Sequence, residues 1–265
     1  MKSMNIAIIG CGNLGMALAR GLIDSGVQAS GIRLTRRHTD VLSSFAEEGC
    51  MVMSDNRKAI EGCSLVILAV KPYNVEALLQ EISPGIIAGQ HIVASVATGI
   101  STATLVSLLP KGTSVFRAMP NTAADVKESL TCVCASGSGR DGSEVVESLF
   151  AVLGEVIWIE EALMEAATVL GACGIAYVMR FIRAMVQGGI EIGFDAHTAS
   201  AIVQQTVRGA AQLLIERSSH PESEIDKVTT PKGCTIAGLN EMEHHGFSSA
   251  LIKGIKASYD QINGK

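Results

Sequence analysis

The chain has 265 residues, which suits one large domain or two medium ones. Apolar residues make up 48% of it and charged residues 18%, so it can bury a sizeable core and its composition does not indicate disorder. The formal net charge of −5 argues against a nucleic-acid partner, because such a surface needs a basic face that displaces counterions.

The seven cysteines are scattered and lack the paired spacing of a zinc site, so we expect a cytoplasmic protein without a metal. The N-terminus leads directly into a strand pattern, which is not typical of a signal peptide. The longest apolar runs, such as "SLVILAV", are too short to span a bilayer, so we expect no membrane partner.

The first half of the chain alternates strand and helix patterns. Short runs rich in Val and Ile predict buried parallel strands at "NIAIIG", "GIRLT", "CSLVILAV", "HIVASVAT" and "TSVFRAMP". Segments with helical spacing lie between them, and two further strand candidates, "LTCVCAS" and "EVIWIE", close this half near Glu160. The alternation predicts an α/β fold with a Rossmann-type doubly wound sheet in residues 1–160.

The second half, residues 161–265, predicts an all-α domain. A long helical pattern begins at Glu161, and a second helix over 196–217 follows the N-cap candidate Asp195. Shorter helices are predicted at "HPESEIDKV" and "TIAGLNEMEHH", the latter ending at Gly246. Ser248 is predicted to cap the last helix.

The stretch from Leu170 to Met179 is apolar on nearly all sides. A small helical domain cannot cover such a surface alone. We therefore expect this half to be a dimerisation domain, in a homodimer or in a larger homo-oligomer built from dimers.

A glycine motif directly follows the first strand. Gly10, Gly12 and Gly15 form the G-x-G-x-x-G pattern between a strand and a helix, which is the context that dinucleotide binding requires. Gly10 permits the tight turn, Gly12 leaves room for a pyrophosphate, and Gly15 allows the helix to pack close to the sheet. The alternative is a strand-to-helix turn without a ligand.

The end of the second predicted strand discriminates between nucleotides. An NAD enzyme usually carries an acid there, whereas this chain has Thr35, Arg36 and Arg37. Because a guanidinium can bind a 2′-phosphate that a carboxylate would repel, NADP(H) is favoured, with NAD(H) possible. The alternative is two solvated arginines at a strand end.

Two later strand ends also point to the cofactor crevice. "AVKPYN" contains Lys71 and Pro72, and "FRAMPNT" contains Met119 and Asn121, whose amide could bond the nicotinamide or its ribose. Ordinary turns are the alternative for both segments.

The segments "GCGNLGMALARGL", "LAVKPYNV", "FRAMPNT" and "HPESEIDKVTTPKGCTIAGLNEME" occur in this order. Together they resemble the Δ1-pyrroline-5-carboxylate reductase family, and the resemblance covers nearly the whole chain. It implies NADPH-dependent reduction of the cyclic imine 1-pyrroline-5-carboxylate to L-proline, the last step of proline biosynthesis. It also implies a helical domain that intertwines two subunits.

The same resemblance assigns the substrate carboxylate to the loop that holds Thr230, Gly233, Cys234 and Thr235, with Thr235 as the catalytic residue near the imine nitrogen. Hydroxyl groups next to a helix N-terminus suit a small anion. The alternative is that Thr230 or Thr235 caps a helix. We predict that the cofactor is bound by Gly10, Gly12, Asn13, Leu14, Gly15, Thr35, Arg36, Arg37, Asn56, Ala69, Val70, Lys71, Pro72, Met119 and Asn121.

The chain departs from the family pattern in the loop and in the long helix. In the loop, Thr230 keeps the hydroxyl of the family's serine and Cys234 keeps the small size of its threonine. Lys232 replaces a glycine, so we expect that its backbone does not need a positive φ, and its charge could attract a carboxylate. The segment "GACGIAY" lacks the family's proline, which removes one cause of helix disruption. We assign its Gly174, Ala176 and Tyr177 to the site or to the dimer interface.

Two other functions stay open. A β-hydroxyacid dehydrogenase has a similar two-domain plan but needs a lysine on the long helix, and residues 161–194 contain arginines and no lysine. A non-catalytic NADP-binding scaffold is the other alternative, because a fold and a cofactor site do not prove chemistry.

Overall fold

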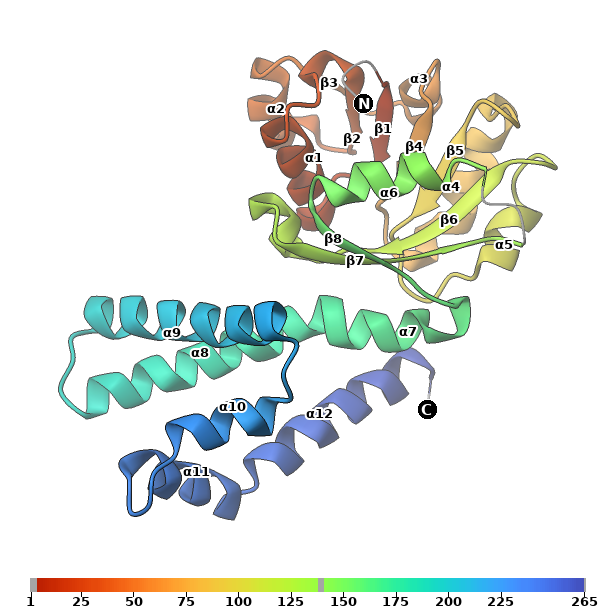
Figure 1. The fold of residues 1–265 in the computed structure, drawn as a ribbon. Coiled ribbons are helices and arrows are strands. Elements are labelled where there is room, and N and C mark those ends of the chain that lie inside the picture. The colour runs from red at the N-terminus through yellow and green to blue at the C-terminus, as the bar shows by residue number, and fades with distance from the viewer. Residues whose placement is uncertain (1–3, 138–140, 265) are drawn as a thin grey trace. The chain divides into compact units, whose positions relative to one another are not determined.

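The computed structural model describes residues 4–137 and 141–264. Packing of the chain divides it into two compact units, one up to Cys173 with the residues from Ile262 onward, the other Gly174–Gln261 (Figure 1). The first unit is α/β and the second is all-α, so the predicted fold class is confirmed. The predicted domain boundary after Glu160 stays a prediction.

The first unit is built on an eight-stranded sheet of order β3-β2-β1-β4-β5-β6-β7-β8. The strands are β1 Ile6–Ile9, β2 Ile32–Thr35, β3 Met51–Met53, β4 Leu65–Leu68, β5 Ile92–Ser95, β6 Ser114–Met119, β7 Ser129–Ala135 and β8 Gly154–Trp158. All neighbours are parallel except β6 and β7, an antiparallel pair connected through the 3-10 segment Thr122–Val126. Strand β3 was not predicted from the sequence, because its three residues are too few to show a period.

Helices cover both faces of this sheet (Figure 1). They are α1 Asn13–Asp24, α2 Ser43–Glu47, α3 Asn56–Ile60, α4 Val75–Ile82, α5 Thr102–Ser107, α6 Ser143–Ala151 and α7 Met164–Ala167. Alternate strand residues enter different cores: Ile8 packs in a cluster with Leu18 of α1, and Ile9 in a cluster with Leu79 of α4. Burial on both faces explains why these strands read as continuous apolar runs.

The second unit consists of the helices α8 Gly174–Glu191, α9 Ala196–Arg217, α10 Pro221–Val228, α11 Cys234–His244 and α12 Phe247–Ile262. Asp195 caps α9 as predicted, accepting bonds from the N–H groups of His197 and Thr198. A Cβ added at Gly189 would lie 3.1 Å from the Cβ of Ala199, so this glycine lets α8 and α9 pack closely.

The predicted cap of the last helix is wrong. Helix α12 already begins at Phe247, so Ser248 lies inside its first turn, where its hydroxyl donates to the carboxylate of Glu243. Gly246 has φ +76°, the left-handed conformation expected after the end of α11.

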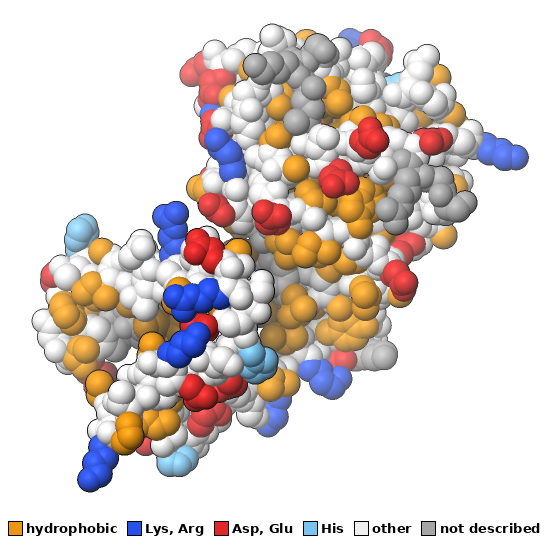
Figure 2. Space-filling view, viewed as in Figure 1, with side chains coloured by type: hydrophobic (Ala, Val, Ile, Leu, Met, Phe, Trp, Pro, Cys, Tyr) orange, Lys and Arg blue, Asp and Glu red, His pale blue; other side chains and the backbone are white. Residues whose placement is uncertain are grey.

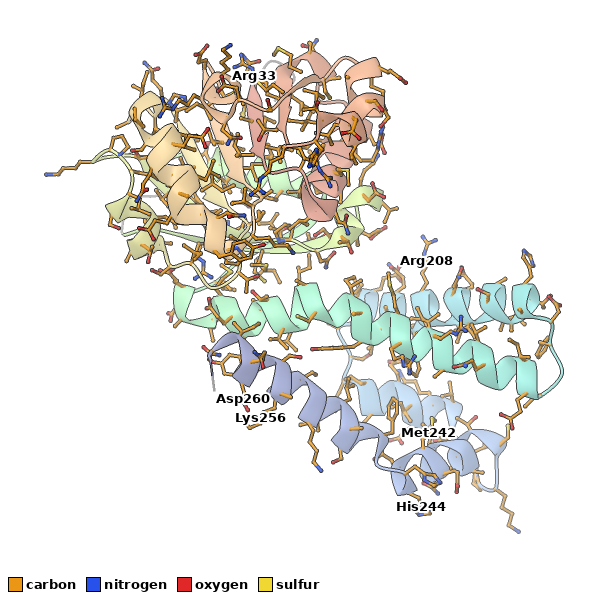
Figure 3. The ribbon with its side chains drawn as sticks, turned by 180° about the vertical axis from the view of Figure 1, so that it is seen from behind. Arg33, Arg208, Met242, His244, Lys256 and Asp260 are labelled. Atoms are coloured by element: carbon orange, nitrogen blue, oxygen red, sulfur yellow. The ribbon has the colours of Figure 1, made fainter. Side chains whose placement is uncertain are left out.

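Large apolar side chains are exposed on the helical unit (Figure 2). They include Val178, Met179, Phe181, Met185, Ile190, Ile202, Leu213, Leu251 and Ile252. Charged side chains also lie on this unit, among them Arg208 of α9 and the Lys256–Asp260 ion pair of α12, at 2.9 Å (Figure 3). Helix α8 has no fully buried residue within this chain, which agrees with a face that a second copy would cover.

The helical stretch Glu161–Glu191 has 31 residues and contains an 18-residue window with a mean hydropathy of 1.6. By length and composition alone it could cross a membrane. This does not contradict the prediction, which concerned uninterrupted apolar runs, because helices that pack within a protein can have the same length and composition.

Candidate active site

The glycine turn between β1 and α1 is held against two neighbouring strands. The N–H groups of Gly10 and Cys11 both donate to the carbonyl of Thr35, at 3.1 and 2.8 Å. Gly10 has φ +88°, and a Cβ there would lie 2.4 Å from Cγ1 of Val70. Both the backbone conformation and the packing therefore require glycine at this position.

Gly12 has the opposite surroundings. A Cβ at Gly12 would have nothing within 4 Å, and no side chain caps α1 there. The first intrahelical bond joins the N–H of Met16 to the carbonyl of Gly12, so the N–H groups of Asn13, Leu14 and Gly15 precede it. An open backbone at a positive helix end fits the pyrophosphate of a dinucleotide.

The predicted ribose site gathers at the end of β2. The buried Thr35 hydroxyl donates to Oδ1 of Asn56 at 2.8 Å, and Nη1 of Arg36 donates to the carbonyl of Cys11 at 3.0 Å. Arg37 is exposed beside them. Thr35, Arg36 and Arg37 are consecutive, and the fold brings Asn56 from the start of α3 to Thr35, in one cluster beside the glycine turn.

Sequence reasoning missed one acidic member of this cluster. The carboxylate of Glu81, on α4, accepts bonds from Nδ2 of Asn56 at 3.1 and 3.3 Å. An acid was sought only directly after the second strand, whereas this one comes from a helix much later in the chain. The signal available was an acid within the otherwise apolar end of the "VEALLQEI" pattern.

The end of β4 also meets the glycine turn. The Cβ of Ala69 and that of an alanine at Gly15 would be 3.5 Å apart, and Val70 contacts Gly10. Lys71 is exposed, and Pro72 begins a 3-10 turn that leads the chain away from the sheet. Ala69 and Val70 are thus brought to the predicted site.

The side chains at the end of β6 make contacts elsewhere in the first unit. Met119 is 4% exposed and packs with Cys132, Cys134 and Met164 in a separate core cluster. The carboxamide of Asn121 is already engaged: Oδ1 accepts from the N–H of Ala123 at 3.0 Å, and Nδ2 donates to the carbonyl of Gly171 at 3.2 Å. Their assignment to cofactor binding stays a prediction.

The long helix is disrupted even without the family's proline. Thr168–Cys173 is π-helical, and π segments leave carbonyls without their usual partners. Asn121 supplies a donor to one of these carbonyls, at Gly171, and the hydroxyl of Thr168 donates to the carbonyl of Met164 at 2.8 Å. The departure "GACGIAY" therefore does not produce a regular helix here.

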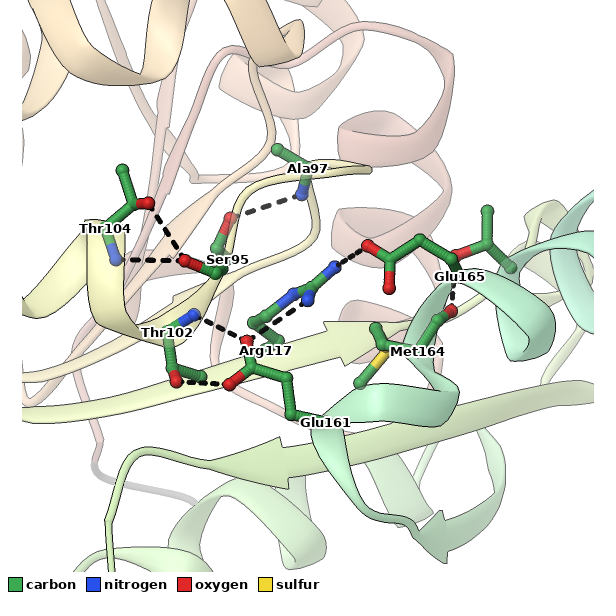
Figure 4. Close-up of polar contacts among 10 residues, drawn as sticks. Ser95, Ala97, Thr102, Thr104, Arg117, Glu161, Met164 and Glu165 are labelled. Carbon is green, nitrogen blue, oxygen red and sulfur yellow. Dashed lines mark hydrogen bonds and ion pairs between the residues drawn. The ribbon is translucent and has the colours of Figure 1, made fainter. Parts of the chain in front are cut away.

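A buried arginine joins β6 to the beginning of the long helix (Figure 4). Arg117, 3% exposed, bonds Glu161 at 3.2 Å and Glu165 at 2.8 Å. Glu161 also accepts from the N–H of Thr102 at 2.6 Å and from its hydroxyl at 2.5 Å. Burial opposes ionisation of Glu161, but the bonds from Thr102 and Arg117 outweigh it, and its pKa lies below the usual 4.5.

The lowered pKa of Glu161 predicts an acid-dependent stability. Its contribution is complete above the unfolded pKa near 4.5 and is lost as the pH falls through the lower folded value. We expect Glu161→Gln, which cannot ionise, to flatten the fall in unfolding free energy below that pH. Denaturant titrations at several acidic pH values would measure it, and an unchanged slope would contradict the assignment.

The threonine-bearing loop between α10 and α11 forms an open helix end. Gly233 is the N-cap of α11, its N–H donates to the carbonyl of Thr230 at 2.9 Å, and no side chain caps the helix. A Cβ at Gly233 would lie 2.6 Å from Oγ1 of Thr230, so glycine is needed for packing although its φ is −72°. Cys234 and Thr235 begin the helix and are exposed. The alternative in which Thr230 or Thr235 caps α11 is not observed.

The expectation for Lys232 is wrong. Its φ is +61°, so this position does have the left-handed conformation that the family's glycine would favour. A non-glycine residue in this conformation costs about 1–2 kcal/mol. The chain therefore carries backbone strain in the same loop that holds Thr230 and Thr235.

We expect Lys232→Gly to stabilise the protein by about 1 kcal/mol and to raise KM for an anionic substrate, because it removes strain and charge together. Lys232→Ala is the matched control, since it removes the charge and keeps the strain. Thermal unfolding and steady-state kinetics separate the two effects. If Lys232→Gly and Lys232→Ala were equally stable, the backbone at this position would not be strained.

Tyr177 is fixed within the helical unit. Its hydroxyl lies 2.5 Å from Oγ of Ser258, which joins α8 to α12. Its neighbours Gly174 and Ala176 lie on the same helix, and Gly174 is half-buried whereas Ala176 is exposed. The described residues contain no group of three or more His, Cys, Asp or Glu side chains that could hold a metal ion.

A Rossmann-type sheet with an open glycine turn, together with an all-α unit that carries an uncapped, hydroxyl-lined helix end, defines the class of two-domain NAD(P)-dependent oxidoreductases. Family models narrow this class. Residues 161–264 match the model described as pyrroline-5-carboxylate reductase dimerisation, and residues 5–99 match NADP oxidoreductase coenzyme F420-dependent. The chain belongs to the pyrroline-5-carboxylate reductase family.

Individual relatives agree with this assignment. Pyrroline-5-carboxylate reductase 2 of Dictyostelium discoideum is 43% identical over 98% of this chain and 92% of its own length. Reductase 1 of the same organism is 44% identical over 97% of this chain, which spans 49% of that longer protein. The crystal structure of Plasmodium falciparum pyrroline carboxylate reductase with NADP bound has the same fold, with a TM-score of 0.90, 22% identity and coverage of 100% and 98%.

Proposed function

We propose that the protein reduces 1-pyrroline-5-carboxylate to L-proline with NADPH. Family membership over nearly the full chain supports the activity. The observation that carries the substrate assignment is the uncapped N-terminus of α11, flanked by Thr230 and Thr235. This arrangement suits the single carboxylate of the substrate.

The cofactor assignment rests on the glycine turn and on the cluster beside it. Gly12 and the first turn of α1 would hold the pyrophosphate, and Arg36 and Arg37 would bind the 2′-phosphate of NADP(H). The Plasmodium falciparum relative was crystallised with NADP, which favours the same choice. When bound, the cofactor supplies a hydride.

The residues of the threonine-bearing loop have three roles in this proposal. The free N–H groups of α11 and the Thr230 hydroxyl bind the substrate carboxylate, and Lys232 adds a positive charge nearby. The Thr235 hydroxyl orients the imine nitrogen and holds its proton through a hydrogen bond. Because a cyclic imine is basic enough to be protonated, the site needs positioning more than a strong acid.

Among the residues that the structure describes, no feature favours the two alternatives. The helix α8 presents Arg180 and Arg183, and residues 161–194 contain no lysine that could serve as the acid of a β-hydroxyacid dehydrogenase. A non-catalytic scaffold would not need the strained, hydroxyl-bearing loop around Lys232.

The assembly and compartment are also proposals. The exposed apolar side chains of α8 lie within the matched dimerisation region, so we propose a homodimer that covers them. All seven cysteines are free, and burial raises the pKa of Cys11 to about 12 and those of Cys50 and Cys134 to about 11. Free, protonated thiols suit a reducing compartment, which we take to be the cytoplasm.

Arg37 provides a test of the cofactor preference. We expect Arg37→Ala to weaken NADPH binding about tenfold and to leave NADH binding unchanged, because the 2′-phosphate loses a charged partner. Fluorescence titrations with both cofactors measure this. Equal weakening of both would show that Arg37 supports the site generally and does not recognise the phosphate.

Turnover tests the proposed function. The purified full chain is mixed with NADPH and 1-pyrroline-5-carboxylate, and the loss of NADPH absorbance and the formation of proline are followed. A β-hydroxyacid with NADP serves as the competing reaction. Proline formation supports the proposal; hydroxyacid oxidation with no imine reduction, or no reaction in either mixture, overturns it.

A further inference from the structure

A chain of four hydrogen-bonding groups connects α4 to the glycine turn. Glu81 accepts from Nδ2 of Asn56 at 3.1 and 3.3 Å, and Oδ1 of Asn56 accepts from the Thr35 hydroxyl at 2.8 Å. The Thr35 oxygen in turn accepts from the N–H of Gly10 at 3.2 Å. We call this series the Glu81 relay.

The chemistry of the groups fixes the direction of every bond in the Glu81 relay. An ionised carboxylate can only accept, so the NH₂ group of Asn56 must face Glu81 and its oxygen must face Thr35. The Thr35 hydroxyl therefore has to donate its one proton to Asn56. Its lone pairs remain for the N–H of Gly10, which is shared between this hydroxyl at 3.2 Å and the Thr35 carbonyl at 3.1 Å.

The first two members of the relay, Glu81 and Asn56, are fixed by the backbone contacts of their helices. The carbonyl of Glu81 accepts from Nε of Arg57 at 2.8 Å, which ties the end of α4 to α3. Asn56 begins α3, directly after the N-cap Asp55, which accepts from the N–H of Lys58 at 3.1 Å. The side-chain amide of Asn56 could still exchange the positions of its oxygen and its nitrogen. The negative charge of Glu81 holds it in one of these two orientations.

We propose that Glu81 is a positioning residue of the cofactor site. It acts through Asn56 and Thr35 on the turn at Gly10, and does so without touching the cofactor's reacting end. The identity of the cofactor in this inference rests on the proposed function. Because the turn at Gly10 serves any dinucleotide, the relay should affect NADPH and NADH alike.

The experiment replaces Glu81 with glutamine, which keeps the shape but can both donate and accept, so it no longer enforces one amide orientation. Glu76→Gln is the control, since Glu76 lies on the same helix and bonds only its exposed neighbour Gln80 among the described residues. Cofactor binding to each protein is measured by fluorescence titration, thermal unfolding by calorimetry, and hydrogen exchange of the Gly10 amide by NMR.

We expect Glu81→Gln to raise Kd roughly three- to tenfold for both NADPH and NADH, the range of one lost hydrogen bond. The Gly10 amide should exchange faster, and Glu76→Gln should match the unmodified protein. In the background of Asn56→Ala the same Glu81→Gln change should have no further effect, because the relay is already broken. Comparing the two single variants with the double variant separates an effect of Glu81 that passes through Asn56 from a general loss of stability.

Three results would overturn the inference: unchanged binding in Glu81→Gln, an equal further loss in the Asn56→Ala background, or tighter NADPH binding with NADH unchanged. The last would mean that Glu81 repels the 2′-phosphate. If the unmodified protein bound neither cofactor, the proposed function would fail instead, and the Gly10 exchange rates would still decide whether the relay orders the turn.

Discussion

Replacing Gly12 with alanine is expected to weaken NADPH binding on the order of 100-fold, about 2.7 kcal/mol, while the protein stays folded. A Cβ at Gly12 meets no protein atom within 4 Å, so it occupies the space proposed for the pyrophosphate. The loss of N-cap glycine should cost at most about 1 kcal/mol of stability. Fluorescence titration and thermal unfolding measure the two quantities.

Gly10→Ala is the matched comparison. Its Cβ would lie 2.4 Å from Cγ1 of Val70, with φ at +88°, so we expect losses of both stability and binding. The two variants thus separate a glycine needed by the fold from a glycine needed by the ligand. Normal NADPH binding by Gly12→Ala would show that the open turn is not the cofactor site.

Removal of Arg117 is expected to have the largest effect on stability. Arg117→Met leaves Glu161 and Glu165 without their shared cation, and breaking a buried ion pair costs about 3–5 kcal/mol. Because both carboxylates are partly exposed, we expect the lower end of that range. Chemical denaturation of the variant gives the free energy of unfolding.

A double variant, Arg117→Met with Glu161→Gln, is the control for this prediction. It removes one of the two unpaired charges and should recover part of the lost stability, since the single change leaves like charges together. Additive losses from the two changes would contradict the ion-pair network drawn in Figure 4.

Local patterns were sufficient to predict most of the fold. Long apolar strands and strong helix caps such as Asp195 depend on nearby residues, and the structure confirms them. The short strand Met51–Met53 and the antiparallel direction of β7 depend on pairing with distant strands, so no local period revealed them. Ser248 is not the cap because the helix begins one residue before it, at Phe247.

The candidate site also combines features that the sequence predicts with features that only the fold reveals. The glycine turn and the threonine-bearing loop are contiguous motifs, and the structure shows each with an open helix end. Glu81 and the Asn121–Gly171 bond join segments that lie far apart in sequence, so only the fold reveals them. Lys232 shows that a backbone conformation can persist after the residue that favours it has been replaced.

Deuteride transfer tests the central claim most directly. The protein is supplied with NADPH carrying deuterium at the transferable position and with 1-pyrroline-5-carboxylate, and the proline formed is analysed by mass spectrometry and NMR. The account predicts one deuterium, on the ring carbon that was the imine carbon, and a much lower yield when Thr235 is replaced by alanine. Absence of labelled proline, or full activity in the Thr235→Ala protein, would contradict it.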